Sequence, residues 1–372
     1  LVNGVIRLTF NEKVEELNEI SGSVNYAENF KDTVQAGENV IKIPLDGKDE
    51  TVNVNIKPNG GKSISKRGEA NPQEQTVRWD VSINTELNTL TNAVVTDAMP
   101  EGLLFKNVKV YPQTINLNGE VVGVGEALRP GVDYVASESG DKVQFIGEYA
   151  KTSKSFKLVY ETDVDKTKIP EQGGDVRYDN TATLSSEGKD DVSASNNASL
   201  TYGKLIEKLP PSFVNDENVK GHVYDLTVNY NNGYKKLPAN SSITDTVSKN
   251  LAYIDDSVKV TTKDGKVLSR GTDYTVTIKD NQMKIEFLKE LDTAVDVTYR
   301  TKVVGDVAGD TEDVNFTNNV KTDSGFEANN GGQIATDGLV KWGDVDYKNR
   351  KINWSIQVNK YQYHMTNWKL SD

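Results

Sequence analysis

Three residue types recur at matching places along the chain and could together form a covalent bond. A Lys lies on an early alternating run, an Asp ends a middle run, and an Asn lies on the last run. The sets are Lys66, Asp97 and Asn180, then Lys208, Asp245 and Asn318, and then Lys341 with Asp372, for which no Asn follows. Lys66 precedes Trp79 by 13 residues and Lys341 precedes Trp354 by 13, and each Trp precedes its Asp by 18.

These residue types suit a Lys–Asn cross-link. Burial lowers the pKa of a Lys, and the resulting neutral amine is a nucleophile. Burial raises the pKa of a carboxyl, which can then hydrogen-bond the Asn carbonyl and shuttle a proton. Attack on the Asn amide releases ammonia and leaves an isopeptide bond. Asp97 and Asp245 would therefore be catalytic once per domain, so we expect no enzyme with turnover.

The alternative is that each Lys is on the surface, each Asp in a turn and each Asn at a hairpin. Repetition of the set favours the cross-link. In the second set Lys204 is a rival to Lys208, because Lys208 precedes Tyr224 by 16 residues rather than 13. The alignment of "GKLIEKL" with "GKSISKR" favours Lys208. The first and last strands of a sandwich can lie side by side, so we expect Lys and Asn to meet in the core.

The elements that must position these residues are β-strands. Runs such as "VRWDVSIN", "VYDLTVNY" and "MKIEFL" alternate apolar and polar residues, with turn signals between them. This pattern indicates tandem immunoglobulin-like β-sandwiches, an all-β fold, with no helix longer than about three turns. The runs beginning at Trp79, Tyr224 and Trp354 match one another, and we expect these three aromatic residues to pack in cores.

The repeat divides the chain into four parts. We expect residues 1–59 to be the C-terminal part of a first immunoglobulin-like domain. Residues 60–201 and 202–332 are predicted to be the second and third domains, and 333–372 the truncated start of a fourth. Both ends read as if cut within a strand, so anchoring signals are expected outside this piece.

Composition narrows the function classes. The chain of 372 residues has no Cys, which fits a secreted Gram-positive surface protein, and no apolar stretch long enough for a membrane span. Its net charge of −12 argues against nucleic-acid partners. His222 and His364 have no metal-binding companions, and the acidic turn from Asp46 to Glu50 reads as solvated. We therefore predict no metal, no cofactor and a monomer.

The stretch from Val5 to about Asn180 resembles the ligand-binding region of Gram-positive, cell-wall-anchored collagen adhesins. The motifs "LTFNEKVEELNEISGSVNY", "SISKRGEANPQEQTVRWDVSIN" and "VVTDAMPEGL" carry the likeness. The resemblance implies a Lys66–Asn180 cross-link assisted by Asp97 and a collagen-binding trench on residues 61–200, closed by a latch segment. Ser65 and Asp80 stand where the family tends to have aromatic residues, and "NNASLTYGKLIEKL" leaves little chain for a latch.

Two functions follow. One is an adhesin that binds an extracellular-matrix protein such as collagen and carries load through cross-linked repeats. The other is a purely structural stalk that projects a separate binding head from the wall. A third class, an enzyme of the wall or matrix, has no recognisable site in the sequence.

Overall fold

The computed structural model describes residues 34–45, 48–214, 216, 218–219, 221–305, 307, 314–336 and 338–372. In this part of the chain the elements are β-strands, joined by two short 3-10 helices, η1 (Gly147–Tyr149) and η2 (Lys166–Lys168). The expected all-β fold without long helices is confirmed for these residues. None of the helices described there is long and apolar enough to cross a membrane.

Two five-stranded sheets enclose the first hydrophobic core. One sheet has the order β3-β4-β12-β7-β8, and the opposing sheet has the order β14-β13-β6-β10-β9. Their bounds are β3 (Ile64–Asn71), β4 (Thr76–Ile83), β6 (Val94–Asp97), β7 (Leu103–Ile115), β8 (Val121–Val124), β9 (Tyr134–Ala136), β10 (Lys142–Phe145), β12 (Ser155–Val164), β13 (Gly174–Ser185) and β14 (Val192–Tyr202). The short β5 (Leu90–Thr91) and β11 (Lys151–Thr152) pair beside them. We call this the first sandwich.

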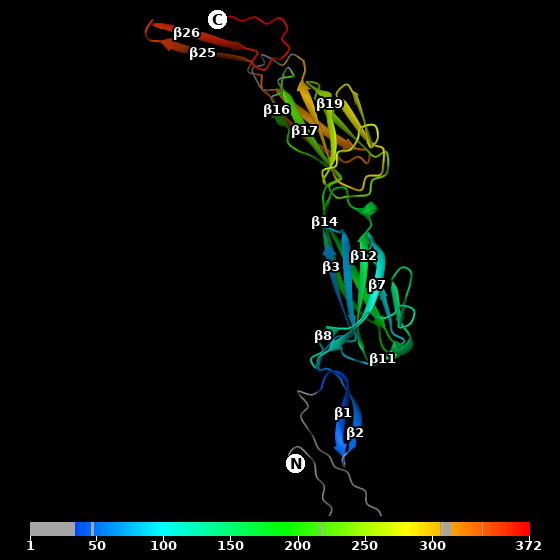
Figure 1. Ribbon diagram of the computed structural model, residues 1–372. Coiled ribbons are helices and arrows are strands. Elements are labelled where there is room, and N and C mark those ends of the chain that lie inside the picture. Colours follow the sequence, from blue (N-terminus) through cyan, green and yellow to red (C-terminus); the bar gives the residue numbers. More distant parts are fainter. Residues whose placement is uncertain are drawn as a thin grey trace, which may run out of the picture.

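A second sandwich follows directly (Figure 1). Its sheets have the orders β15-β17-β22-β19, with β16 also on β17, and β20-β21-β18-β23-β24. The bounds are β15 (Ile206–Lys208), β16 (Ser212–Val214), β17 (Val223–Tyr230), β18 (Ser242–Val247), β19 (Leu251–Thr262), β20 (Tyr274–Lys279), β21 (Gln282–Phe287), β22 (Val295–Val303), β23 (Val314–Thr322) and β24 (Glu327–Ile334).

Alternation in the sequence explains which face of each strand is buried. On β4, Val77, Trp79, Val81 and Ile83 are fully buried, whereas the residues between them face outward. The period of two places apolar side chains on one face of a strand, and two such faces close on each other to exclude water. Each sandwich therefore has its own core.

Two hairpins flank the sandwiches in Figure 1, one formed by β1 (Gly37–Leu45) and β2 (Lys48–Ile56), the other by β25 (Leu339–Asp346) and β26 (Lys351–Val358). The motif "LTFNEKVEELNEISGSVNY" lies outside the described residues. The prediction that Trp354 is a core residue is wrong, because this side chain on β26 is 59% exposed. Among the described residues, no second sheet covers the hairpin, whereas Trp79 lies between two sheets.

Strand register corrects two further expectations. Lys66 pairs with Val81 and Lys208 with Val228, so Leu226, rather than Tyr224, is the counterpart of Trp79. Asn180 lies on β13 and Asn318 on β23, each the penultimate strand of its sandwich rather than the last. The Lys-bearing strands belong to the opposite sheets, so Lys and Asn face each other across the core and do not lie side by side on neighbouring strands.

The two aromatic residues of the repeat give a stability test. Trp79→Ala should lower the free energy of unfolding of the first sandwich by roughly 3–5 kcal/mol, because it opens a cavity in a closed core. Trp354→Ala should change little, since its ring is already largely in water. Urea denaturation, monitored by hydrogen exchange of β4 and β12, measures the free energy of unfolding of the first sandwich. Equal losses for the two variants would contradict the burial described here.

Candidate functional site

The first candidate set meets in the core of the first sandwich. Lys66 projects from β3, Asp97 ends β6, and Asn180 lies on β13, with exposed fractions of 8%, 0% and 3%. The Nζ of Lys66 forms an ion pair with the carboxylate of Asp97. The same Nζ lies over the rings of Trp79 and Tyr160, 5.2 and 5.8 Å from their centroids. The sequence prediction thus named residues that the fold brings together from opposite sheets.

Burial shifts the charge states of this pair. Desolvation lowers the pKa of Lys66 and raises that of Asp97, and the attraction between them opposes both shifts only in part. Both shifts favour transfer of the proton from amine to carboxyl, which yields a neutral nucleophile beside a neutral acid. The amide of Asn180 makes no hydrogen bond of standard geometry, yet it lies close enough to Asp97 to lower the pKa of that carboxyl. A buried amide without such bonds is unusual and fits a reactive group.

The second set is more fully hydrogen-bonded. Lys208 Nζ lies 2.6 Å from Asp245 Oδ2 and 2.5 Å from the hydroxyl of Tyr299. Asn318 donates its Nδ2 to Asp245 Oδ1 at 2.6 Å, and the Tyr299 hydroxyl donates to Asn318 Oδ1 at 3.3 Å. Burial lowers the pKa of Lys208. Lys204, its rival in the sequence, is exposed, whereas Lys208 is buried.

The amide orientation in this set differs from the expected one. We expected the carboxyl to bind the Asn carbonyl, but Asp245 accepts from the amide nitrogen, and Tyr299 donates to the carbonyl oxygen. Asp245 is therefore placed to protonate the departing nitrogen, and Tyr299 to stabilise a developing oxyanion. Tyr253, which also donates to Asp245 at 2.8 Å, was missed by the sequence reasoning. The match of "LVYETDV" to "VTYRTKV" could have pointed to Tyr299, the counterpart of Tyr160.

The third set is assembled but open to solvent. Lys341 forms an ion pair with Asp372, and these side chains are 40% and 54% exposed. The Nζ of Lys341 lies 4.8 Å from the centroid of the Trp354 ring. The arrangement repeats the Lys, Asp and Trp grouping of the first sandwich without its burial. The desolvation that would activate the amine is thus missing here.

A polar surface covers the outer face of the β3-β4-β12-β7 sheet, on the side away from Lys66. Asp80 lies at its centre and forms ion pairs with Arg78 at 2.9 Å and Lys157 at 2.7 Å. Strand register arranges the face in three rows. They are Ser65, Ser82, Lys157 and Tyr111; Arg67, Asp80, Val159 and Lys109; and Glu69, Arg78, Glu161 and Asn107. Ser65 and Asp80, the departures from the family pattern, therefore both belong to this outer face.

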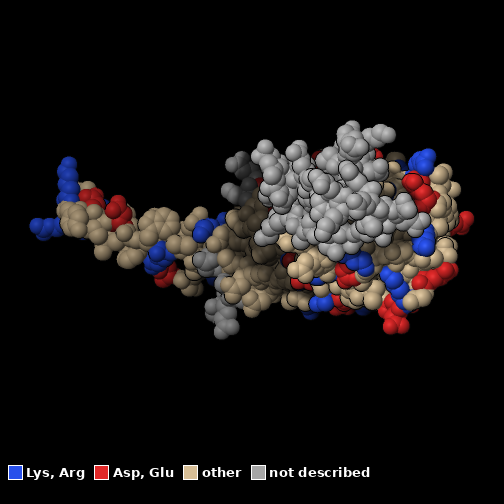
Figure 2. All heavy atoms as spheres, turned by 90° about the horizontal axis from the view of Figure 1, so that it is seen from below, with Lys and Arg blue, Asp and Glu red and all other residues tan. Residues whose placement is uncertain are grey.

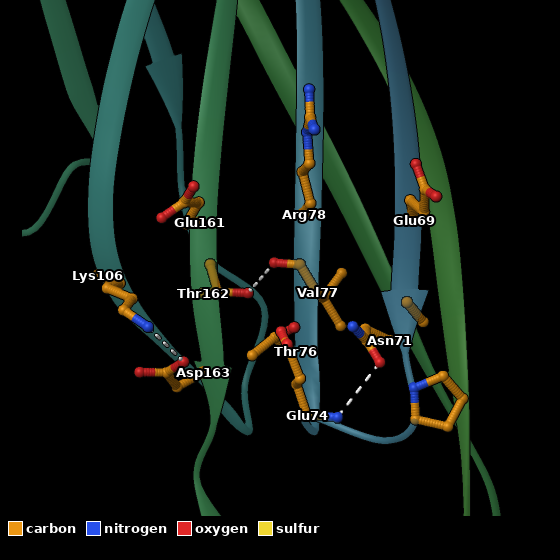
Figure 3. A pocket seen from close by; sticks show the side chains of 12 residues that line it. Glu69, Asn71, Glu74, Thr76, Val77, Arg78, Lys106, Glu161, Thr162 and Asp163 are labelled. Carbon is orange, nitrogen blue, oxygen red and sulfur yellow. Dashed lines mark hydrogen bonds and ion pairs between the residues drawn. The ribbon is translucent and has the colours of Figure 1, made fainter.

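One edge of the outer face is hollowed into a groove of about 440 Å³ (Figure 3). Glu69, Arg78 and Glu161 reach it from the third row, and Lys106 forms an ion pair with Asp163 at its far side. The lining is mainly polar, and half of its residues are charged, so the groove suits an extended polar ligand better than a small apolar one. Seen from below, acidic and basic side chains are interspersed on the visible surface (Figure 2).

The two histidines are not part of a site of this kind. His222 is enclosed by aromatic rings, with Phe213 at 4.6 Å and Tyr361 at 4.1 Å between centroids. His364 lies in the segment after β26, beside Thr366. Within the described ranges, no three His, Cys, Asp or Glu side chains are grouped as metal ligands would be. The acidic turn from Asp46 to Glu50 contains residues outside those ranges.

Comparison with known proteins defines the class of the first sandwich. Residues 61–195 match the family model of the collagen binding domain. The resemblance read from the sequence is therefore confirmed for this part of the chain. A search of curated proteins found no match.

Solved structures of similar proteins were also found. The collagen adhesin CNA from S. aureus is 12% identical, with 79% of this chain and 94% of that chain covered and a TM-score of 0.28. The collagen-binding domain of a Staphylococcus aureus adhesin is 18% identical over 38% and 99%, with a TM-score of 0.26. That of Erysipelothrix rhusiopathiae surface protein RspB is 12% identical over 79% and 95%, with a TM-score of 0.26.

The buried pair of the second sandwich gives a stability test. Lys208→Met keeps most of the side-chain volume but removes the buried amine that donates to Asp245 and Tyr299. We expect the free energy of unfolding of the second sandwich to fall by roughly 3–5 kcal/mol. Hydrogen exchange of β22 measures it. Lys204→Met is the matched control and should have no effect, so a similar loss there would show that the exposed Lys is the structural one.

Proposed function

We propose that this chain is part of an extracellular surface adhesin whose first sandwich binds a collagen-like matrix protein. The observation that carries the proposal is the match of residues 61–195 to the collagen binding domain. The outer face of the β3-β4-β12-β7 sheet is the candidate surface, because its rows are mainly polar and it is bordered by the groove. The partner would be a protein of the extracellular matrix, without nucleic acid, membrane insertion or a cofactor, and the adhesin would act as a monomer.

The chemistry of this face indicates how it would recognise a triple helix. Collagen-like chains expose the side chains at the X and Y positions of each Gly-X-Y triplet. The three rows of the face combine acidic, basic, amide and hydroxyl groups with one valine, and the charged groups can pair with charged X and Y residues and fix the register of the ligand. Asp80 is held between two cations and is thereby preorganised. We therefore expect salt-sensitive, charge-selective binding rather than binding through aromatic anchors.

A latch after the first sandwich has little support. β14 pairs with β13 along its whole length, from Gly174 opposite Tyr202 to Leu184 opposite Val192. The chain then enters the second sandwich within four residues, because β15 begins at Ile206. We propose that the ligand is held on the open face without closure by this segment.

The binding proposal is tested by reversing one charge. Asp80→Lys should weaken binding to immobilised fibrillar collagen about tenfold or more, equal to roughly 1.4 kcal/mol. Surface plasmon resonance at two salt concentrations measures it. Asp225→Lys on the second sandwich, where Asp225 pairs with Arg300 at 2.8 Å, is the matched control and should bind as the parent does.

Absence of binding by the parent chain would favour the alternative function, a structural stalk that projects a separate head. The polarity of the face and the repetition of the sandwiches are the observations that favour a stalk. In both cases we propose the division into 1–59, 60–201, 202–332 and 333–372. We also propose an extracellular location with anchoring to the cell wall.

We further propose that Lys66 joins Asn180, and Lys208 joins Asn318, through isopeptide bonds. The neutral amine attacks Cγ of the Asn, and a C–N bond forms as the C–NH₂ bond breaks. The proton lost by the attacking amine passes through Asp97 or Asp245 to the departing nitrogen, which leaves as ammonia. Atoms and charge balance without any co-reactant. The support is the buried, paired geometry of both sets.

Mass spectrometry tests the cross-links directly. The intact mass of the whole chain should be lower than the sequence mass by one ammonia for each bond. Asp97→Ala and Asp245→Ala should each restore one ammonia, because the proton shuttle is lost. Lys341 and Asp372 should contribute no loss. A parent with the full sequence mass would refute the cross-links without touching the binding proposal.

A further inference from the structure

The same five-residue loop follows the corresponding strand of each repeat. It begins immediately after β4, β17 and β26, at Asn84, Asn231 and Asn359. Each of these residues has a left-handed backbone, with φ of 58°, 63° and 50°. The fourth residue is again left-handed in all cases, with φ of 53° at Leu87, 58° at Tyr234 and 57° at Gln362. Two such residues at fixed spacing define one backbone shape, which recurs in three places.

The first Asn side chain closes this loop by two hydrogen bonds to the backbone of the fifth residue. Its Oδ1 accepts from that N–H at 2.9 Å in residues 84–88, 2.8 Å in 231–235 and 2.8 Å in 359–363. Its Nδ2 donates to the carbonyl oxygen at 2.8, 2.8 and 2.7 Å. We call these three segments the Asn-closed loops. These two hydrogen bonds fix the direction in which the side chain of the fifth residue leaves the loop.

The fifth residue of each loop contacts residues of the part of the chain that precedes its own repeat. Asn88 Oδ1 accepts from Lys57 Nζ, just after β2, at 2.8 Å. Lys235 Nζ donates to the Ile169 carbonyl at 3.1 Å and pairs with Glu171 at 3.1 Å, both in the first sandwich. The Tyr363 hydroxyl lies 2.7 Å from His222 Nδ1 and donates to the Ala335 carbonyl at 3.0 Å. The loop shape is shared, whereas the fifth side chain and its partner differ at every junction.

The junction between the two sandwiches is closely packed around this contact. Gln75 donates to the Gly233 carbonyl at 3.4 Å, and the Lys236 N–H to the Lys166 carbonyl at 3.0 Å. A Cβ on Gly203 would lie 2.6 Å from Asn232 Cβ, so glycine is needed for this approach. The Lys235–Glu171 pair is about one-fifth exposed on each side, so it is partly shielded from solvent. The contact therefore constrains the orientation of the sandwiches.

From these observations we propose that the Asn-closed loop is a docking element that seats each repeat on the part of the chain before it. The fifth residue supplies the contact specific to that junction. The partner surface is the end of the preceding sandwich, or the segment leaving the preceding sheet. The array is then a stiff rod assembled by a recurring connector, whatever ligand the first sandwich binds.

The test compares two neighbouring lysines. Lys235→Ala removes the side chain that crosses the junction and keeps the loop closure by Asn231. Lys236→Ala is the matched control, because Lys236 pairs with Glu290 within the second sandwich at 3.1 Å. The chain lacks Cys, so nitroxide labels can be placed on Cys introduced at exposed Lys142 and Lys279. Double electron–electron resonance then reports the spread of distances between the sandwiches.

We expect a narrow distribution in the parent and in Lys236→Ala, and a broader one in Lys235→Ala. Trypsin should also cut after Lys204, within the junction, about tenfold faster in Lys235→Ala. A tenfold change corresponds to a free-energy difference of roughly 1.4 kcal/mol. The double exchange Lys235→Glu with Glu171→Lys should restore part of the narrow distribution. A broad distribution in the parent, or equal broadening in both single variants, would overturn the proposal.

Discussion

Both sandwiches depend on a charged pair that a hydrophobic core would ordinarily exclude. Removing an ammonium and a carboxylate from water costs several kcal/mol per ion, and only close pairing and hydrogen bonding offset this. In each core the Lys comes from one sheet and the Asp from the other, so the pair spans the gap between the sheets. The apolar faces must therefore close around it in one register. The same desolvation that makes the pair costly lowers the pKa of the amine and thus provides the reactivity that the proposed bond requires.

The two cores meet this constraint differently. Around Lys208 the pair is surrounded by hydroxyl and amide groups, and Asp245 accepts bonds from Tyr253 and Asn318. Around Lys66 the neighbours are the faces of Trp79 and Tyr160, and the Tyr160 hydroxyl has no hydrogen-bond partner. The first amine is thus stabilised by ring faces and one carboxylate, and the second by a polar network. A shared Lys, Asp and Asn set therefore does not imply equal environments, and the two reactions need not proceed at equal rates.

Sequence patterns were sufficient for many of the described strands and for the members of the two buried sets, although the third set, Lys341 and Asp372, is exposed. Period-two alternation identifies a strand and its inward face, and repetition of Lys, Asp and Asn at matching places distinguished these residues from ordinary surface residues. Alignment of the repeats paired Tyr224 with Trp79 wrongly, because the equivalent position depends on strand register. An extra strand, β16, lies between Lys208 and β17 and shifts Tyr224 away from the position equivalent to Trp79. It also failed for Trp354, whose burial depends on a covering sheet and not on its own strand. Tyr253 was unpredictable because its role comes from a cross-core contact, not from spacing.

The penultimate position of Asn180 changes how load would pass through the first sandwich. A Lys66–Asn180 bond carries force from β3 directly into β13 and bypasses every strand between them. It leaves β14 outside the covalent loop, held by its ladder to β13 and its packing beside β3. Pulling on the following sandwich would therefore first act on β14, at Tyr202 and Gly203. This exit is where the Asn-closed loop of the second sandwich is seated, with Gly203 packed against Asn232. The proposed docking contact would thus protect the strand that the proposed cross-link leaves out, so a stiff array would need both.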